Sequence, residues 1–232
     1  MDKNKRHQKT QHRYGMNVVG LLGLAAMTFG LTACYRSIPS NFYTLTPAIQ
    51  PMVSSNIKLI EVIPIGLPAR LNTSLMVIQN PDGKTYQLDN ERWSSMLSNE
   101  LQNAISTGLQ QKLGAIDVYN TGLTGGQVVY TVATEFSRFD IVKQPQQTNI
   151  EVIAAWVVKP RYPQKSLNAL NQIQQLNCRM TFQKVISEDH NNYLKIVQNY
   201  QASVQDVTTA IAQSILSVDQ KQPVKMDHVV CT

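Results

Sequence analysis

The most regular hydrophobic pattern in the chain is a row of apolar residues that recur every four positions. This row consists of Trp93, Leu97, Leu101, Ile105, Leu109 and Leu113. The spacing predicts a helix of about six turns, capped at its start by Asp89 or Asn90 and ended by Gly114. A single apolar stripe is typical of a helix that lies across a sheet, so we expect Trp93 to be a core residue that packs with Leu97.

A second long helix is predicted over residues 202–218. Its apolar positions fall on one side and are Val204, Val207, Ile211, Ile215 and Val218. The tail from residue 223 to residue 232 is expected to be irregular.

Segments rich in Val, Ile, Tyr and Phe, bounded by Pro, Gly and Asn, predict strands. They cover residues 57–65, 74–79, 85–88, 116–119, 128–142, 150–158 and 178–186. Residues 159–177 interrupt this succession of strand-forming segments and predict a loop that carries a short polar helix. The pattern as a whole predicts a single α+β domain, with an about five-stranded, mostly antiparallel sheet packed by two long helices.

A different pattern occupies residues 1–33. Residues 1–15 are polar and basic and residues 16–33 carry no charge, which is typical of a secretory signal peptide. The apolar run is shorter than the roughly 20 residues that span a bilayer. It ends in Leu31-Thr32-Ala33-Cys34, which resembles a bacterial lipobox with Cys34 as the lipid attachment residue. The alternative is an uncleaved signal anchor, and a cysteine at the expected cleavage position argues against it.

The residues after Cys34 indicate where the anchor lies and how the domain is joined to it. Tyr35 stands where lipoproteins of the inner membrane commonly carry Asp, so we expect the chain at the periplasmic face of the outer membrane. Residues 34–56 are rich in Ser, Pro, Thr and Asn and predict a lipidated tether. Within the tether, residues 42–45 are a short patch that can add a strand to the domain edge. The periplasmic domain is expected over residues 57–232.

Two cysteines remain besides Cys34. In an oxidising compartment, an even number of remaining cysteines predicts one disulfide, between Cys178 and Cys231. Closing a loop of roughly 54 residues would stabilise the fold by up to about 4 kcal/mol. The alternative is two unpaired thiols. A structural zinc site is not expected, because the cysteines together with His190 and His228 lack close ligand pairs.

Most of the formal net charge of +6 is carried by residues 1–33, the expected signal peptide. Residues 1–33 hold five of the 21 Lys and Arg and one of the 15 acidic residues, so 16 basic and 14 acidic side chains remain. A stripe that neutralises many phosphates cannot be built from so small an excess, and nucleic acid is not an expected partner.

Catalytic motifs are absent from the sequence. There is no Gly-x-Ser-x-Gly, no His-Glu-x-x-His and no Walker-type loop, and the glycine cluster 122–126 is typical of a turn. His190 and His228, the histidines after the leader, lack a recognisable partner pattern. We therefore expect no enzyme, no cofactor and no metal, although the sequence alone leaves a pair of converging carboxylates open.

Several short motifs occur in a characteristic order. The lipobox is followed by Phe42-Tyr43-Thr44-Leu45, then by Pro64-Ile65-Gly66-Leu67-Pro68-Ala69, then by Arg92-Trp93 at the start of a long helix that ends over residues 109–113. In this order they resemble the ABC-type transport auxiliary lipoproteins, the family of the paraquat-inducible protein C. The resemblance covers most of the mature chain.

The resemblance implies a non-catalytic periplasmic subunit that is tethered to the outer membrane. Its implied partner is a mammalian-cell-entry-type substrate-binding protein of an ABC system that moves lipids between the inner and outer membranes. The alternatives are a structural envelope lipoprotein that binds the cell wall or an assembly machine, and a degenerate enzyme. The sequence leaves open which lipid is moved and whether the chain forms a homo-oligomer.

A candidate partner contact lies in the short connection over residues 67–73. Pro68, Arg70 and Asn72 crowd this connection between two predicted strands, where an always-charged guanidinium and backbone groups can face a partner. The alternative is an ordinary solvated turn.

Overall fold

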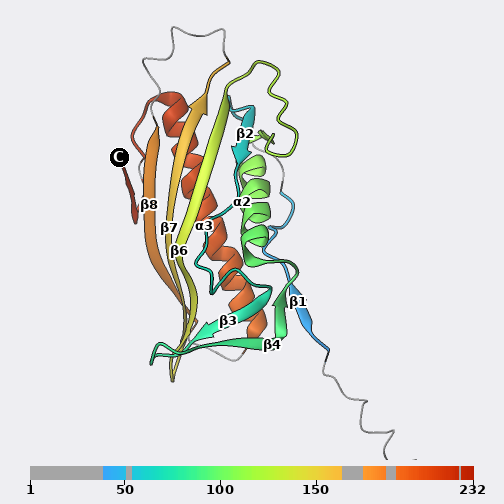
Figure 1. Ribbon diagram of the computed structural model, residues 1–232. Coiled ribbons are helices and arrows are strands. Elements are labelled where there is room, and N and C mark those ends of the chain that lie inside the picture. Colours follow the sequence, from blue (N-terminus) through green and yellow to red (C-terminus); the bar gives the residue numbers. More distant parts are fainter. Residues whose placement is uncertain (1–38, 51–53, 164–174, 187–191, 225) are drawn as a thin grey trace, which may run out of the picture. The chain divides into compact units, whose positions relative to one another are not determined.

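One sheet with two helices against one of its faces is the architecture of this computed structural model (Figure 1). The structure describes residues 39–50, 54–163, 175–186, 192–224 and 226–232. The helices are α2 (Leu97–Leu113) and α3 (Tyr193–Gln220). The strands are β1 (Asn41–Tyr43), β2 (Leu59–Val62), β3 (Leu75–Gln79), β4 (Thr85–Trp93), β5 (Ile116–Asp117), β6 (Val129–Lys143), β7 (Thr148–Arg161), β8 (Leu176–Ile186) and β9 (Val229–Cys231).

The sheet is mixed, and within the described residues it has nine strands. The main path runs β1-β4-β3-β6-β7-β8-β9, and β2 pairs with both β5 and β6. The pairings β1–β4, β2–β5, β2–β6 and β3–β6 are parallel, and the others are antiparallel. The expected α+β class with two helices is confirmed. The sheet differs from the expectation in having nine strands rather than about five and in its parallel pairings, while the longest pairings, β6–β7 and β7–β8, are antiparallel as expected. Short strands and long-range parallel pairs leave little trace in local periodicity.

Strand β6 is a central strand of this sheet, and other strands pair with both of its edges. Along one edge it pairs with β7 for almost its whole length. Along the other edge it takes β2 beside residues 129–132, a bridge from Gly66 to Glu135, and then β3 beside residues 141–142. The connection from β2 to β3 therefore runs along the edge of β6, and this places the turn over residues 67–73 beside it.

Helix α2 begins later than its apolar spacing predicts. Residues 89–93 belong to β4, where residues 91–93 pair with β1, and the helix starts at Leu97 without a side-chain cap. The expected cap at Asp89 or Asn90 was therefore wrong, because pairing with a distant strand outweighs a locally helical spacing. The expected end is confirmed, since Gly114 adopts the left-handed conformation and donates its backbone N–H to the carbonyl of Gln110.

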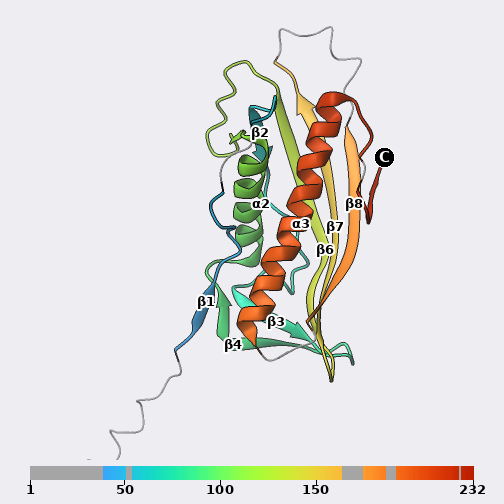
Figure 2. The same ribbon diagram turned by 180° about the vertical axis from the view of Figure 1, so that it is seen from behind.

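Helix α3 begins nine residues before the predicted start at residue 202. Asn192 caps it by accepting a hydrogen bond from the backbone N–H of Lys195, and Ile196, Val197 and Tyr200 are buried on its first turns. Figure 2 shows α3 crossing the strands with α2 beside it, both on the same face of the sheet.

An aromatic cluster joins helix α3 to strands β4 and β6. Tyr200 stacks on Phe139 of β6, with ring centroids 4.1 Å apart, and its hydroxyl donates to the carbonyl of Phe139. Phe136 also stacks with Phe139, with ring centroids 5.2 Å apart, and the centroid of the Trp93 ring lies 5.1 Å from that of Tyr200. Trp93 is 2% exposed, which confirms that it is a core residue.

The ends of the described unit are strands that the sequence analysis left weak or missing. β1 pairs with β4 at one sheet edge, within the segment expected to be a tether, and Leu45 after it is buried. Residues 229–231, expected to be irregular, form β9 on β8. Residues 159–161, expected in a loop, extend β7, while residues 164–174 of that loop lie outside the described residues.

One buried hydroxyl leads to a stability prediction. Thr134 is 5% exposed on β6, and its hydroxyl has no hydrogen-bond partner among the residues the structure describes. An unpaired buried hydroxyl is costly, and valine has the same shape and a higher strand preference. We expect Thr134→Val to raise the free energy of unfolding by about 1 kcal/mol in a urea titration. Thr208→Val is the control and should not stabilise, because the Thr208 hydroxyl bonds the carbonyl of Val204.

Candidate functional site

The predicted contact over residues 67–73 is a hydrogen-bonded turn on the edge of β6. The backbone N–H of Leu71 donates to the carbonyl of Pro68 at 2.9 Å, and the N–H of Asn72 to that of Ala69 at 3.3 Å. Leu71 is 2% exposed and fixes the turn to the core. Arg70 and Asn72 are exposed and Pro68 is half-buried, so the turn presents a mixed polar and apolar surface.

An ion-pair network fastens this turn to the sheet. Nη2 of Arg70 lies 2.8 Å from both carboxylate oxygens of Asp140, whose side chain is only 3% exposed. Nε of Arg138 lies 3.4 Å from the same carboxylate, and Nη1 of Arg138 lies 2.7 Å from Glu151 on β7. A buried carboxylate that is bonded by two cations holds both of them in place.

Nη2 of Arg70 is therefore engaged by Asp140, although the side chain remains 42% exposed. The expectation that Arg70 faces a partner stays a prediction. Pro68 and Asn72 carry no charge and take no part in this ion-pair network. Sequence reasoning missed Asp140 and Arg138, because 70 residues separate Asp140 from Arg70 and only the path of the β2–β3 connection brings them together.

A second polar cluster holds the segment that leads from the N-terminus into the domain. Glu91 accepts hydrogen bonds from Asn41 and from the Tyr43 hydroxyl, at 2.9 and 2.7 Å. Glu100, which is 5% exposed, accepts from the Leu45 backbone N–H at 3.0 Å and also from the hydroxyls of Thr44 and Ser95. Two carboxylates thus fix residues 41–45 to β4 and α2.

Burial and the Glu91 carboxylate act together on Tyr43. Desolvation raises the pKa of the Tyr43 hydroxyl, and the hydrogen bond and negative charge of Glu91 raise it further, to about 12. The hydroxyl therefore stays protonated and bonded to Glu91 over the whole physiological range.

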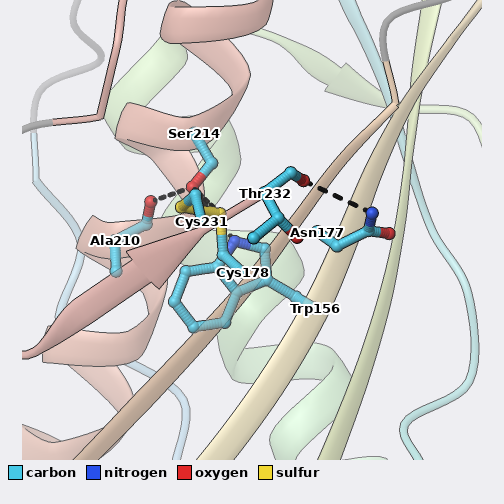
Figure 3. The surroundings of a disulfide bond; sticks show 7 residues. All are labelled: Trp156, Asn177, Cys178, Ala210, Ser214, Cys231 and Thr232. Atoms are coloured by element: carbon cyan, nitrogen blue, oxygen red, sulfur yellow. Dashed lines mark hydrogen bonds between the residues drawn. A yellow bond between two sulfur atoms is a disulfide. The ribbon is translucent and has the colours of Figure 1, made fainter.

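Cys178 and Cys231 are joined by a disulfide in the structure, across the β8–β9 pair (Figure 3). Cys178 is 4% exposed and its sulfur lies 3.5 Å from the Ser214 hydroxyl. That hydroxyl also accepts from the Trp156 ring nitrogen at 3.0 Å. Asn177 and Thr232 exchange backbone hydrogen bonds beside the bridge, and these bonds hold the C-terminus against the sheet.

The described residues include only some of the candidate metal-ligating and catalytic side chains. No group of three His, Cys, Asp or Glu among them is arranged to hold a metal ion. His228 is exposed in the C-terminal turn, and His190 lies outside the described residues. Cys34 and residues 1–33, the expected signal peptide, also lie outside them. No helix in the described part has the length and hydropathy needed to cross a membrane.

Comparison with known proteins identifies the family. The model of the ABC-type transport auxiliary lipoprotein component matches residues 43–212, and the chain belongs to this family. Membership in this family implies a membrane-anchored envelope protein associated with an ABC transport system. No curated protein matches the chain significantly.

Two solved structures are similar to the chain at low sequence identity. One is the crystal structure of an uncharacterized protein, with 18% identity and a TM-score of 0.53, and the match covers 76% of this chain and 99% of that one. The other comes from Xanthomonas campestris, with 12% identity and a TM-score of 0.48, over 79% of this chain and 96% of that one. The first of these likenesses shows the fold alone.

The disulfide can be tested by mass and by stability. Protein purified without reductant should have an intact mass lower by two hydrogens than the reduced form, and neither Cys178 nor Cys231 should react with an alkylating reagent after denaturation. Cys231→Ser should lower the free energy of unfolding by up to about 4 kcal/mol, because the bridge closes a long loop. Alkylation of Cys178 or Cys231 in the unreduced protein, located by peptide mapping, would reject the bridge.

The tyrosine bonded to Glu91 predicts an alkaline loss of stability. Because its pKa rises from an unfolded value near 10 to about 12 on folding, its contribution is complete below pH 10 and disappears between about pH 10 and 12. Over this window the free energy of unfolding should fall more steeply in the wild type than in Tyr43→Phe. Tyr119→Phe, at an exposed turn position, should keep the wild-type slope.

Proposed function

We propose that the protein is a non-catalytic lipoprotein of the outer membrane, facing the periplasm, which assists an ABC transport system in moving lipids between the two membranes. Its proposed partner is the mammalian-cell-entry-type substrate-binding protein of that system. The family match over residues 43–212 carries the proposal, because it includes the turn over residues 67–73, all of α2 and most of α3.

The sequence around Cys34 supports the anchoring part of the proposal. A lipobox cysteine preceded by an uncharged apolar run receives several acyl chains, which together give stable membrane attachment. Six residues separate Cys34 from β1, and a chain of this length spans at most about 25 Å. A folded domain joined to the membrane by so short a segment works near the membrane surface, so its partner has to reach it there.

The turn over residues 67–73 supports the docking part. It combines an exposed asparagine and a half-buried proline with a backbone that the Arg70–Asp140 pair and buried Leu71 hold in one conformation. A surface that is already ordered loses little conformational entropy when a partner binds.

Lipid attachment is tested at Cys34. Cys34→Ala should abolish labelling with radioactive palmitate in growing cells, because the thiol that carries the lipid is gone, and should move the protein out of the detergent-requiring membrane fraction. Labelling that persists in this variant would contradict the lipobox interpretation.

Partner contact is tested by crosslinking in living cells. A photo-reactive amino acid at Asn72 should crosslink to the membrane-anchored substrate-binding protein of an ABC system. The matched control is Asn120, another exposed turn asparagine, which should give no such product. Pro68→Gly combined with Asn72→Ser should weaken crosslinking from a neighbouring turn position at least several-fold.

The variant in this crosslinking experiment has to leave the fold intact. Arg70 and Leu71 are kept, because replacing them would strand the buried carboxylate of Asp140 or open the core. An unchanged melting temperature checks this. Crosslinks that map only to peptidoglycan or to outer-membrane assembly proteins would replace the transport proposal with a structural role.

A further inference from the structure

A groove of about 490 Å³ runs along the outer side of the α2–α3 pair and is bounded by the N-terminal segment Leu45–Gln50. The helices approach closely at Gly108, where a Cβ would stand 2.8 Å from the Thr208 methyl group. The apolar groups of the groove floor, Leu45, Ala104 and Val204, are each no more than 3% exposed. Its accessible surface is mixed, with slightly more apolar than polar area, and the polar part comes from side chains such as Gln198 and Gln205.

Part of this groove already holds a stretch of polypeptide in the structure. Residues 44–50 are not helical, and side-chain amides of the groove bind their backbone. Nε2 of Gln201 donates to the carbonyl of Thr44 at 2.9 Å, and Nε2 of Gln111 donates to the carbonyl of Ala48 at 3.5 Å. The groove thus recognises main-chain groups through glutamines on both helices.

Two further glutamines on α3 carry side-chain amides that could bind a polypeptide backbone in the same way. Gln198 and Gln205 lie three residues before and four residues after Gln201, so they share its face of the helix. Both line the groove and are exposed, and neither side chain has a hydrogen-bond partner among the described residues. Each amide has two donor hydrogens and an acceptor oxygen.

We propose that this groove binds an extended polypeptide segment of a partner protein, which lies beside residues 44–50 and is held through its backbone by Gln198 and Gln205. A glutamine amide matches the donor and acceptor groups of an extended backbone, as in peptide recognition that relies on main-chain bonds. The volume lies within the usual range of binding clefts. Lys112 is the only charged side chain of the groove lining, so the segment is uncharged or acidic where it passes this residue.

The two glutamine amides disfavour the other kinds of occupant. A lipid acyl chain could contact the apolar part of the lining, but it would remove water from the two amides without offering them partners, which is costly. A nucleic acid would meet a single cation. This proposal does not depend on which transport partner the turn over residues 67–73 contacts.

The test uses the full chain in detergent and a phage-displayed library of linear peptides, from which the best binder is synthesised. Gln198→Ala combined with Gln205→Ala should weaken the Kd of that peptide about tenfold or more, since two hydrogen bonds are lost. Gln213→Ala is the matched control, because Gln213 is an exposed glutamine of α3 outside the groove, and it should bind like the wild type. Methylating single backbone nitrogens of the peptide should weaken binding more than alanine substitutions of its side chains.

Three results would overturn the proposal, provided that the double variant melts at the wild-type temperature. The first is a selection that yields no binder. The second is a binder whose Kd is the same for the wild type and the double variant. The third is a spin-labelled stearate that binds the wild type and is lost in the double variant, which would assign the groove to lipid.

Discussion

The fold depends on one 15-residue strand that is bonded along both edges. β7 covers one edge of β6, while the other edge takes β2, Gly66 and β3 in turn, so the connection between those strands follows the sheet. Gly66 permits this close approach, since a Cβ there would stand 3.1 Å from the Glu135 side chain. The path carries Arg70 to Asp140, so the position of the exposed turn is a consequence of how β6 pairs.

The sequence was a good guide where structure is local and a poor one where it is long-range. The four-residue spacing located α2 from Leu97 to Leu113, and the cysteine count anticipated the Cys178–Cys231 pair that the structure contains. The same spacing wrongly placed residues 89–93 in the helix, because it cannot register that β1, about 50 residues earlier, pairs with them. The strand β9 is three residues long and has no periodicity to find.

The candidate site was accessible from the sequence only in outline. Pro68, Arg70 and Asn72 lie in the connection between β2 and β3, which is longer than expected because β2 ends at Val62. The role of the arginine depends on Asp140, which the sequence shows only as one of several polar residues in a predicted strand. The role of Glu100 was hidden in the same way, because a glutamate on an amphipathic helix is usually solvated and nothing in the local sequence indicates that this one is buried. Its burial and its bonds to residues 44 and 45 exist only because the N-terminal segment crosses the start of α2.

The N-terminal segment connects the features of the molecule that face outward. Residues 41–43 form a sheet edge, Leu45 reaches the core beside Glu100, and residues 45–50 form one wall of the α2–α3 groove. A force applied at the N-terminal side of this segment acts first on the short β1–β4 pairing and the Glu91 bonds, and then on the bonds of Glu100. Because the segment and the groove share Gln201 and Gln111, releasing the segment would change the groove, whereas the turn at residues 67–73 is held separately by Asp140.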